Sequence, residues 1–540
     1  MGQSVWKENK KWICLVIMIM VLQVLVASYF CIQKQGFHYD EYYSYYSSNV
    51  TYGLVPTDRE WKDVAEIISE FQVQKGEGFR YGLVKTMQSF DVHPPLYYMI
   101  LHTICSLFPG MFSKWFGLGL NLFLFILCYF LLARIAYVVF RGNRPLVVCT
   151  CLLYGCQAGV LSGITFIRMY VLLTMWCLLV TLWHERAWKE RLRMTPINSF
   201  FLILLVMAGF LTHYYFAVFM LFTAAFTCLY QWIVEKNLKG SICYGIAVCT
   251  GMGMAVVWYP SCLSHIFRGY RGMEATDAFF DLGNTLVRLD FFTDLMNQSV
   301  FGGSFWILFL LLIMLLLGIW GSITEKKEKI KLFLKEHTGL FHIAVVTAGY
   351  FLVVAKTALL NAEEANRYEL PVYGFIMLLF LAGFSVLSQW ISQRIREGTV
   401  EKKVWKISWL FFIGSIFCSQ LLALKEGKVQ FLYPEDRENI QWAREHEKAA
   451  ILYLYNPDNT WMIWDEAEEL MQYEQIYFVS LADISPVTDE VLLKEEEIYV
   501  YASRREEAES MMEHLVQENP RWETKEKIRE LLYCDLYHLY

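Results

Sequence analysis

Two adjacent carboxylates, Asp40 and Glu41, lie in a tyrosine-rich run, GFHYDEYYSYYSSN (36–49), shortly after a strongly apolar segment. A carboxylate can act as a general base that takes a proton from a reacting hydroxyl group, or it can ligate a metal ion. Acidic residues also occur beside a membrane simply because water is near. The pair is a candidate catalytic pair, and its role depends on the groups that surround it.

A second motif, SFDVHPPLYYMILH (89–102), holds Asp91 and His93 just before two prolines. Proline lacks an N–H and suits the first turn of a helix, so the prolines mark where the next segment enters the membrane. The alternative is an interfacial turn with aromatic-belt tyrosines. In either case Asp91 and His93 are predicted to lie at the membrane surface.

Cations come from four more segments. They are Arg168 with Tyr170 in TFIRMYVLLTM (165–175), His213 in FLTHYYFAV (210–218), His265, Arg268 and Arg271 in SHIFRGYRGMEATD (264–277), and Arg367 in EEANRYELPVYG (363–374). Arginine binds phosphate through several N–H groups, and close to lipid it usually pairs with an acid or an anion. An arginine can also reach water along the helix, and a lone interfacial histidine is often only structural.

The composition indicates that membrane-spanning helices position these residues. The 540-residue chain is 56% hydrophobic and only 19% charged, with a mean hydropathy of +0.34. Apolar stretches of about 20 residues, long enough to cross a hydrocarbon core of about 30 Å, recur between short charged loops. The fold class expected is an all-α polytopic membrane protein with about 11 to 12 transmembrane helices.

The basic loops predict the orientation, because short basic loops stay in the cytoplasm. These loops are 7–11, 141–144, 184–193, 235–239, 324–337 and 393–406. The spans between or after them are 146–163, 168–183, 197–212, 214–232, 241–262, 304–322, 338–358, 371–391 and 407–424. The stretch 96–140 must cross an odd number of times but holds two apolar segments, of which 96–108 is short enough to be re-entrant. The external segments are then 33–95, 164–168, the turn around 213, 263–303, 359–370 and the tail 425–540, so the candidate site is predicted to be extracytoplasmic.

The tail has a different character, since charged residues alternate with the short apolar runs 449–456, 475–481 and 496–503. These runs predict strands of a small extracytoplasmic α/β domain, with helices over 464–473 and 504–517. We therefore expect a transmembrane domain over 1–425 and the α/β domain over 426–540. In the first external loop, 57–72 has apolar residues at helical spacing and is predicted to be an amphipathic helix in the interface plane.

The sequence argues against three other features: a cleaved signal peptide, a metal-binding set of cysteines and a nucleic-acid partner. The apolar run 12–32 lacks a small-residue cleavage site and is interpreted as a retained first helix rather than a signal peptide. The 14 cysteines lie mostly in apolar runs without metal-ligand spacing, which is typical of core residues. The net charge of −6 and the absence of a basic patch argue against a nucleic-acid partner.

The motifs also resemble a family. YDEYYSY in the first external loop, HPPLYY at the start of the next membrane segment, then RMY, HYY and RYELP in that order, resemble the bacterial integral-membrane glycosyltransferases of the GT-C fold. The resemblance covers most of 1–425. Within that fold the chain is most similar to the protein O-mannosyltransferases and the lipid A aminoarabinose transferases.

The resemblance implies transfer of a sugar from a polyprenyl-phosphate-linked donor to an acceptor glycan, lipid or protein at the outer face of the cell membrane, as part of cell-envelope assembly. Asp40 would be the main catalytic carboxylate, with Glu41 beside it, and His93 and Arg268 or Arg271 would meet the donor phosphate. Relatives carry a metal-binding Glu where this chain has Val92. A divalent metal ion therefore stays an open alternative, with Asp91 and His265 as its first candidate ligands.

Two other functions remain open at this level. A transporter or flippase for lipid-linked glycans would need ionisable residues deep within its spans and internal repeats, and the sequence shows few of the former and none of the latter. A non-catalytic assembly protein would tolerate loss of the outer acids and arginines.

Overall fold

The computed structural model describes residues 2–49, 58–304, 337–394, 399–483 and 485–540. By its internal contacts the chain divides into two compact units. The first, called the helical unit, comprises 1–31, 88–97 and 117–430. The second, called the sheet unit, comprises 32–87, 98–116 and 431–540. Each unit is described by itself.

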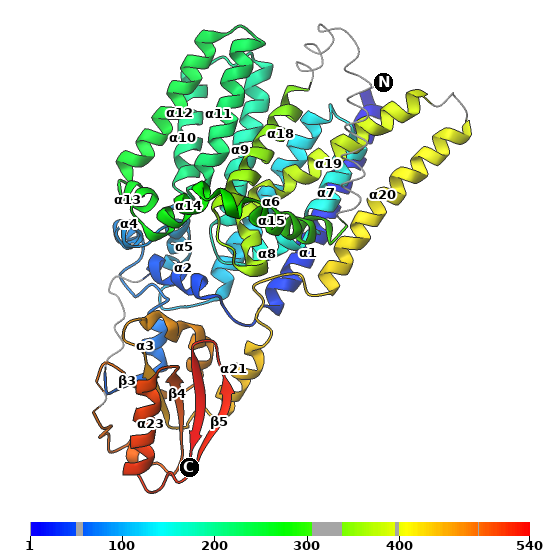
Figure 1. Ribbon diagram of the computed structural model, residues 1–540. Helices are drawn as coiled ribbons and strands as arrows, with labels where there is room; N and C mark the ends of the chain where they lie inside the picture. The colour runs from blue at the N-terminus through cyan, green and yellow to red at the C-terminus, as the bar shows by residue number, and fades with distance from the viewer. Residues whose placement is uncertain (1, 50–57, 305–336, 395–398, 484) are drawn as a thin grey trace. The chain divides into compact units, whose positions relative to one another are not determined.

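Long apolar helices make up the helical unit (Figure 1). They are α1 (Gly2–Gln33, whose last two residues belong to the sheet unit), α6 (Lys114–Val139), α9 (Tyr170–Lys189), α10 (Pro196–Phe210), α11 (Tyr215–Ile233), α12 (Leu238–Trp258), α15 (Thr285–Phe301), α18 (Thr338–Thr357), α19 (Asn366–Arg394) and α20 (Thr399–Lys425). Short helices α13 (Ser261–Phe267), α14 (Tyr270–Phe280), η1 (Leu282–Asn284) and η2 (Ala362–Ala365) connect them.

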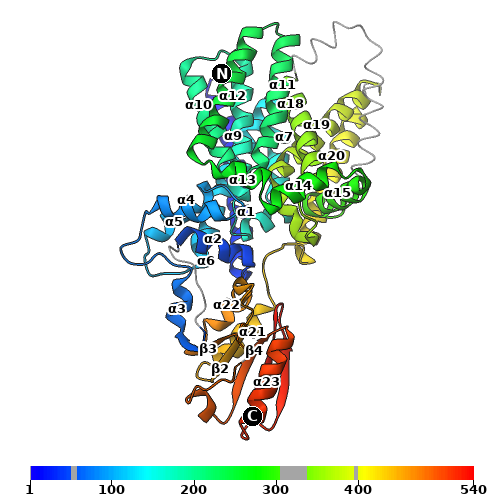
Figure 2. The ribbon, with the colours of Figure 1, turned by 60° about the vertical axis from the view of Figure 1, so that its left-hand side comes forward.

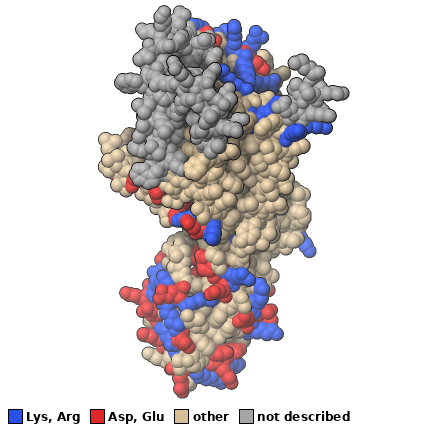
Figure 3. Space-filling view, turned by 90° about the vertical axis from the view of Figure 1, so that its right-hand side faces the viewer, with Lys and Arg blue, Asp and Glu red and all other residues tan. Residues whose placement is uncertain are grey.

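Six helices among the described residues are long and apolar enough to cross a membrane, and a seventh span is possible if one bent pair counts as a single crossing. Three shorter apolar helices, including α5 (Leu96–Ser106), add to these. On the face shown in Figure 3 a broad band of the helical unit carries almost no Lys, Arg, Asp or Glu, and basic residues gather above it. The chain is a helical membrane protein. The predicted span 304–322 lies almost entirely outside the described residues, and the number of 11 to 12 spans stays a prediction.

The bent pair is α7 (Arg144–Tyr154) and α8 (Ala158–Thr165), which meet at 54°. Two glutamines satisfy the carbonyl groups that the break leaves without helical partners. Gln23 donates from Nε2 to the carbonyls of Cys151 (2.9 Å) and Leu152 (2.8 Å), and Gln420 donates to that of Leu153 (3.0 Å). The predicted span 146–163 is therefore a broken helix.

The sheet unit is built around six strands in the order β1-β3-β2-β4-β6-β5. They are β1 (Glu60–Asp63), β2 (Ile451–Tyr455), β3 (Gln475–Ser480), β4 (Ile498–Ser503), β5 (Lys525–Glu530) and β6 (Cys534–Leu539). β2 pairs in parallel with β3 and β4, and the outer strands are antiparallel. The three predicted strands are thus confirmed, and they form the centre of the sheet.

Both faces of this sheet are covered, which explains why its central strands are continuous apolar runs. Helix α23 (Glu506–Glu518), near the predicted helix 504–517, packs with Leu452 and Leu454 on one face. Helices α21 (Asp436–Glu445) and α22 (Ala467–Leu470) pack with Ile451 and Tyr453 on the other, as Figure 2 also shows. The predicted helix 464–473 is partly the 3-10 helix η3 (Thr460–Glu466).

The amphipathic helix predicted over 57–72 is wrong for its first half. Residues 60–63 form β1, whose Trp61 lies opposite Tyr477 of β3, and only α3 (Val64–Ser69) is helical. Trp61 packs against the core of the sheet. The remaining elements of the sheet unit are α2 (Tyr39–Asn49), α5, η4 (Leu492–Lys494) and most of α4 (Tyr81–Phe90).

Candidate active site

The predicted acidic pair lies at the start of α2 in the sheet unit, and its two members have different surroundings. Glu41 is completely buried, and Lys34 Nζ lies 2.8 Å from its Oε2. The backbone N–H of His38 also donates to this oxygen (2.7 Å), which is the arrangement of a helix-capping box. The Glu41 carboxylate therefore holds the first turn of α2 in place.

Asp40 is more accessible, with 23% of its side chain exposed. Its Oδ2 lies 3.7 Å from Nδ1 of His38, and its backbone N–H donates to the same nitrogen (3.0 Å). The rigid start of α2 thus presents the Asp40 carboxylate at the surface of the unit. Of the two acids, Asp40 is the more exposed, and its role as a general base stays a prediction.

The tyrosines of this run brace α2. Tyr42 and Tyr45 are buried, and their hydroxyl groups donate to Glu468 Oε1 (3.2 Å) and the carbonyl of Ser113 (2.8 Å). Burial raises the pKa of Glu468 to about 7. Burial also raises the pKa of Asp436 to about 7. Asp436 is close enough to Tyr42 to act on it electrostatically. These two carboxyl groups near α2 are therefore partly protonated at neutral pH.

In the helical unit, the loop between α8 and α9 carries Arg168, which is 2% exposed. Asn121 of α6 holds this loop by donating to the carbonyls of Ile164 (3.2 Å) and Phe166 (2.7 Å). Gly117, one helical turn earlier on α6, leaves room for the loop, because a Cβ there would lie 2.1 Å from Ile167. The sequence therefore fixes the position of Arg168 through two small or polar positions of a neighbouring helix.

Arg168 meets the histidine of the HPP motif. Its Nη2 lies 3.3 Å from Nδ1 and 3.4 Å from Nε2 of His93, and Nδ1 of His93 lies 3.1 Å from Oδ2 of Asp91. Because a carboxylate can only accept, Nδ1 of His93 donates to Asp91 when Asp91 is ionised. Burial would raise the pKa of Asp91, but His93 and Arg168 together lower it below its usual value. Asp91, His93 and Arg168 form one connected group.

Aromatic rings and a second arginine extend this group. The centroid of the His213 ring lies 6.0 Å from the centroid of the His93 ring and 5.4 Å from that of the Tyr170 ring. Burial, with His93 and Arg168 nearby, holds the pKa of His213 well below its usual value, so His213 is neutral. Arg367 is 2% exposed, and its guanidinium carbon lies 5.1 Å from the centroid of the Phe166 ring. Phe166 itself lies two residues before Arg168.

We call Asp91, His93, Arg168, Tyr170, His213 and Arg367 the arginine cluster. His265 adjoins it, because its Nε2 lies 3.2 Å from the carbonyl oxygen of Ser89, two residues before Asp91. Arg271, paired with Glu274 at 3.0 Å, lies at its margin near Tyr368. Arg268 is exposed on the chain between α13 and α14 and is not brought into the cluster. Asp40 and Glu41 belong to the other unit, and their convergence with the cluster stays a prediction.

The proposed metal ligands do not fit a metal ion. The Nε2 of His265 faces the carbonyl of Ser89 (3.2 Å), which can only accept, so Nε2 carries the proton. Nδ1 of His265 then accepts from the hydroxyl of Tyr214 (2.8 Å). Both ring nitrogens are engaged, and no group of three or more His, Cys, Asp or Glu suited to a metal occurs among the described residues.

Sequence reasoning missed three contributors to these sites. Lys34, the ion-pair partner of Glu41, is a cation seven residues earlier on the same predicted external segment, and that spacing was its only signal. Asn121 is an uncharged polar residue within a long apolar stretch of α6. Glu369, in the RYELP motif, is completely buried, and neither of its carboxylate oxygens has a hydrogen-bond partner in the part of the chain that the structure describes.

The comparisons with known proteins concern the fold. No protein-family model matches the chain, and no curated protein matches its sequence. Among solved structures, it is similar to ArnT from Cupriavidus metallidurans bound to undecaprenyl phosphate, with a TM-score of 0.50, 9% identity and 98% of each chain covered. The protein thus shares the GT-C fold of that glycosyltransferase over nearly its whole length.

Proposed function

We propose that the protein transfers a sugar from a polyprenyl-phosphate-linked donor to an acceptor hydroxyl group at the outer face of the membrane. The observation that carries the proposal is the arginine cluster, in which buried Arg168 contacts His93 and buried Arg367 lies over the ring of Phe166 on the same loop. The chain has the fold of a protein solved with undecaprenyl phosphate. Buried guanidinium groups near a membrane surface suit a lipid phosphate.

In this proposal Arg168 and Arg367 bind the donor phosphate. His93 orients Arg168, and Asp91 fixes the tautomer of His93 through the 3.1 Å contact. His213 is neutral, so it can donate one hydrogen bond without adding charge. Arg271, being half exposed at the margin, meets the donor as it enters.

Asp40 is proposed as the general base. Its carboxylate takes the proton of the acceptor hydroxyl while the acceptor oxygen forms a bond to the anomeric carbon. The bond between that carbon and the phosphate oxygen breaks with inversion, and its electron pair stays on the phosphate. The leaving polyprenyl phosphate gains negative charge, which the arginines stabilise more strongly than they stabilise the donor. This step relies on the topology predicted from the sequence, which puts Asp40 and the arginines on the same side of the membrane.

The first test is binding of undecaprenyl phosphate to the purified full-length chain in detergent, measured by native mass spectrometry. Arg168→Ala is expected to weaken binding about 100-fold, since a charge-assisted interaction of roughly 2 to 3 kcal/mol is lost. Arg186→Ala is the matched control, because Arg186 is an 82% exposed arginine on α9. Equal affinity of Arg168→Ala and the wild type would contradict the donor site.

Turnover separates the enzyme from the alternatives. An enzyme releases undecaprenyl phosphate from at least one member of a panel of undecaprenyl-phosphate-linked sugars, whereas a flippase or an assembly protein binds such lipids and leaves them intact. Binding without release across the panel, with acceptors present, would favour those functions.

A further inference from the structure

A cavity of about 610 Å³ lies in the helical unit between the ends of four helices. Residues from the C-terminal ends of α9 and α11, from the first turn of α18 and from the chain just after α6 line it. Its volume is within the range of roughly 300 to 1,000 Å³ that is typical of small-molecule sites.

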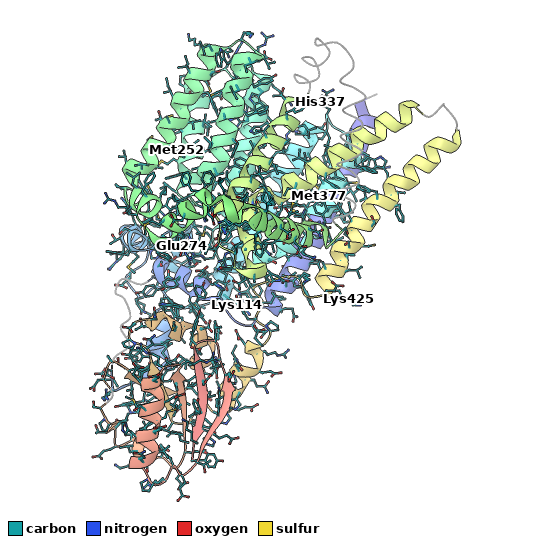
Figure 4. The ribbon with its side chains drawn as sticks, in the orientation of Figure 1. Lys114, Met252, Glu274, His337, Met377 and Lys425 are labelled. Carbon is teal, nitrogen blue, oxygen red and sulfur yellow. The ribbon has the colours of Figure 1, made fainter. Side chains whose placement is uncertain are left out.

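The cavity and the arginine cluster lie at opposite ends of the same helix. Tyr170 begins α9 and belongs to the cluster, and Lys189 ends α9 and lines the cavity. At 1.5 Å per residue the 20-residue helix is roughly 30 Å long, about the thickness of a hydrocarbon core. Figure 4 shows His337, a cavity residue, near one end of the helical unit and Glu274 toward the other. Helix α11, which is long and apolar enough to cross a membrane, likewise begins beside His213 of the cluster and carries Tyr230 of the cavity near its end. We therefore expect the cavity at the headgroup depth of the leaflet opposite the cluster.

The lining of the cavity combines both signs of charge. Arg141, Lys189 and Arg191 are exposed cations at its edge, and half-buried Glu235, which accepts from the hydroxyl of Tyr230 (3.3 Å), also lines it. Inside, Glu185 is 7% exposed, and its Oε1 has no hydrogen-bond partner among the described residues. The indole N–H of Trp188 is likewise buried without an acceptor in that part of the chain. A ligand with an anionic group outside and a cationic group inside would complement this arrangement.

Gly339 in the first turn of α18 gives Glu185 its place. A Cβ at this position would lie 1.9 Å from Oε1 of Glu185, so any other residue would displace the carboxylate. Trp188 and Tyr230, also in the lining, are of the types enriched at membrane interfaces.

We propose that this cavity holds the headgroup of a phospholipid that carries a primary amine as well as a phosphate. The phosphate lies among Arg141, Lys189 and Arg191, where cations are exposed to the interface. The ammonium group donates to Glu185, which replaces the hydrogen bond that this buried carboxylate lacks. This site is separate from the donor site, so it stands or falls independently of the proposed reaction.

The test is native mass spectrometry of the full-length protein in detergent with equal amounts of phosphatidylethanolamine, phosphatidylglycerol and phosphatidylcholine. The wild type is expected to retain phosphatidylethanolamine about tenfold better than the other two, since only its headgroup has an ammonium that can donate to a carboxylate. Equal retention of the three lipids would overturn the proposal.

Variants locate the effect. Glu185→Gln and Gly339→Ala are expected to remove the preference for phosphatidylethanolamine, and a Lys189→Gln/Arg191→Gln pair to lower retention of all three lipids. Arg186→Gln is the control and keeps the preference. The midpoint of thermal unfolding, followed by tryptophan fluorescence on the same samples, is expected to be unchanged and reports that each variant is folded.

A preference for phosphatidylethanolamine that survives in Glu185→Gln would contradict the assignment of this carboxylate.

Glycerophosphoethanolamine, the water-soluble headgroup, is expected to compete poorly, because it lacks the acyl chains that keep a lipid at this depth. Displacement of the lipid by equimolar glycerophosphoethanolamine would show that the site serves a soluble ligand and would overturn the lipid assignment.

Discussion

Glu41 and Asp40 are adjacent in sequence and differ in what their carboxylates contact. Glu41 is locked between Lys34 and the backbone of His38, and Asp40 is partly exposed. The sequence could identify the pair but could not rank its members, because the ranking depends on Lys34, whose approach to Glu41 is a matter of tertiary structure. Of the two acids, only Glu41 is held in a fully buried ion pair, which is why Asp40 is the one proposed as the base.

Glu41→Gln is expected to lower the free energy of unfolding by about 3 to 5 kcal/mol, because it leaves the buried Lys34 ammonium without its counter-charge. Asp40→Asn should change stability by less than about 0.5 kcal/mol. Denaturant unfolding in detergent, followed by tryptophan fluorescence, measures both. A Lys34→Met/Glu41→Leu double variant should recover most of the loss, and equal destabilisation of the two single variants would refute the distinction.

A buried acid in the sheet unit makes stability depend on pH. Glu466 accepts from the hydroxyl of Tyr453 (3.0 Å) and the thiol of Cys534 (3.4 Å), and burial raises its pKa from 4.5 to about 8. Since the folded state holds this proton more tightly, its stability contribution is complete below pH 4.5 and is lost as the pH rises to about 8.

Unfolding of the wild type is therefore expected to become easier by a few kcal/mol between these limits, at roughly 1.4 kcal/mol per unit of pKa difference. Glu466→Gln, which stays neutral, should make the profile less steep, and Glu468 and Asp436, whose pKa values burial also raises, account for the pH dependence that remains. Thermal unfolding at a series of pH values provides the measurement, and identical profiles for the two proteins would exclude Glu466 as the source.

At the scale of elements, helix α6 positions the Arg168 loop. Gly117→Ala would place a methyl group 2.1 Å from Ile167 and move the loop, whereas Gly119→Ala, half a turn further on, meets nothing within 4 Å. We expect undecaprenyl phosphate to bind Gly117→Ala at least tenfold more weakly and Gly119→Ala as well as the wild type. Native mass spectrometry measures the binding. Equal affinities of Gly117→Ala and the wild type would show that the position of the loop does not depend on this contact.

The elements that the sequence predicts are those with a strong apolar signal. β2, β3 and β4 are buried on both faces and read as apolar runs, and the long helices of the helical unit read as spans. β5 (KEKIRE) and β1 (EWKD) were missed because they are the edge strands of the sheet, where charged residues are tolerated and the apolar pattern disappears. The break at 155–157 was missed because glutamines from α1 and α20 stabilise it.

At the scale of the whole molecule, the shared GT-C fold and the basic loops lead to one prediction about orientation. The arginine cluster and the C-terminal α/β domain are predicted to face outward, and the loop around 184–193 inward. A peptide tag at the C-terminus should be removed by protease added to intact spheroplasts, and a tag inserted after Arg193 should be protected until the membrane is permeabilised. The opposite pattern would place the site on the cytoplasmic side.

The central claim is that the protein breaks the bond between a sugar and a polyprenyl phosphate with Asp40 as the base. The direct measurement is release of undecaprenyl phosphate from undecaprenyl-phosphate-linked sugars by the purified wild type, by Asp40→Asn and by the exposed-carboxylate control Asp277→Asn. We predict release by the wild type and the control, and at least a 100-fold lower rate for a folded Asp40→Asn that still binds undecaprenyl phosphate. An Asp40→Asn variant with the wild-type rate would contradict the account.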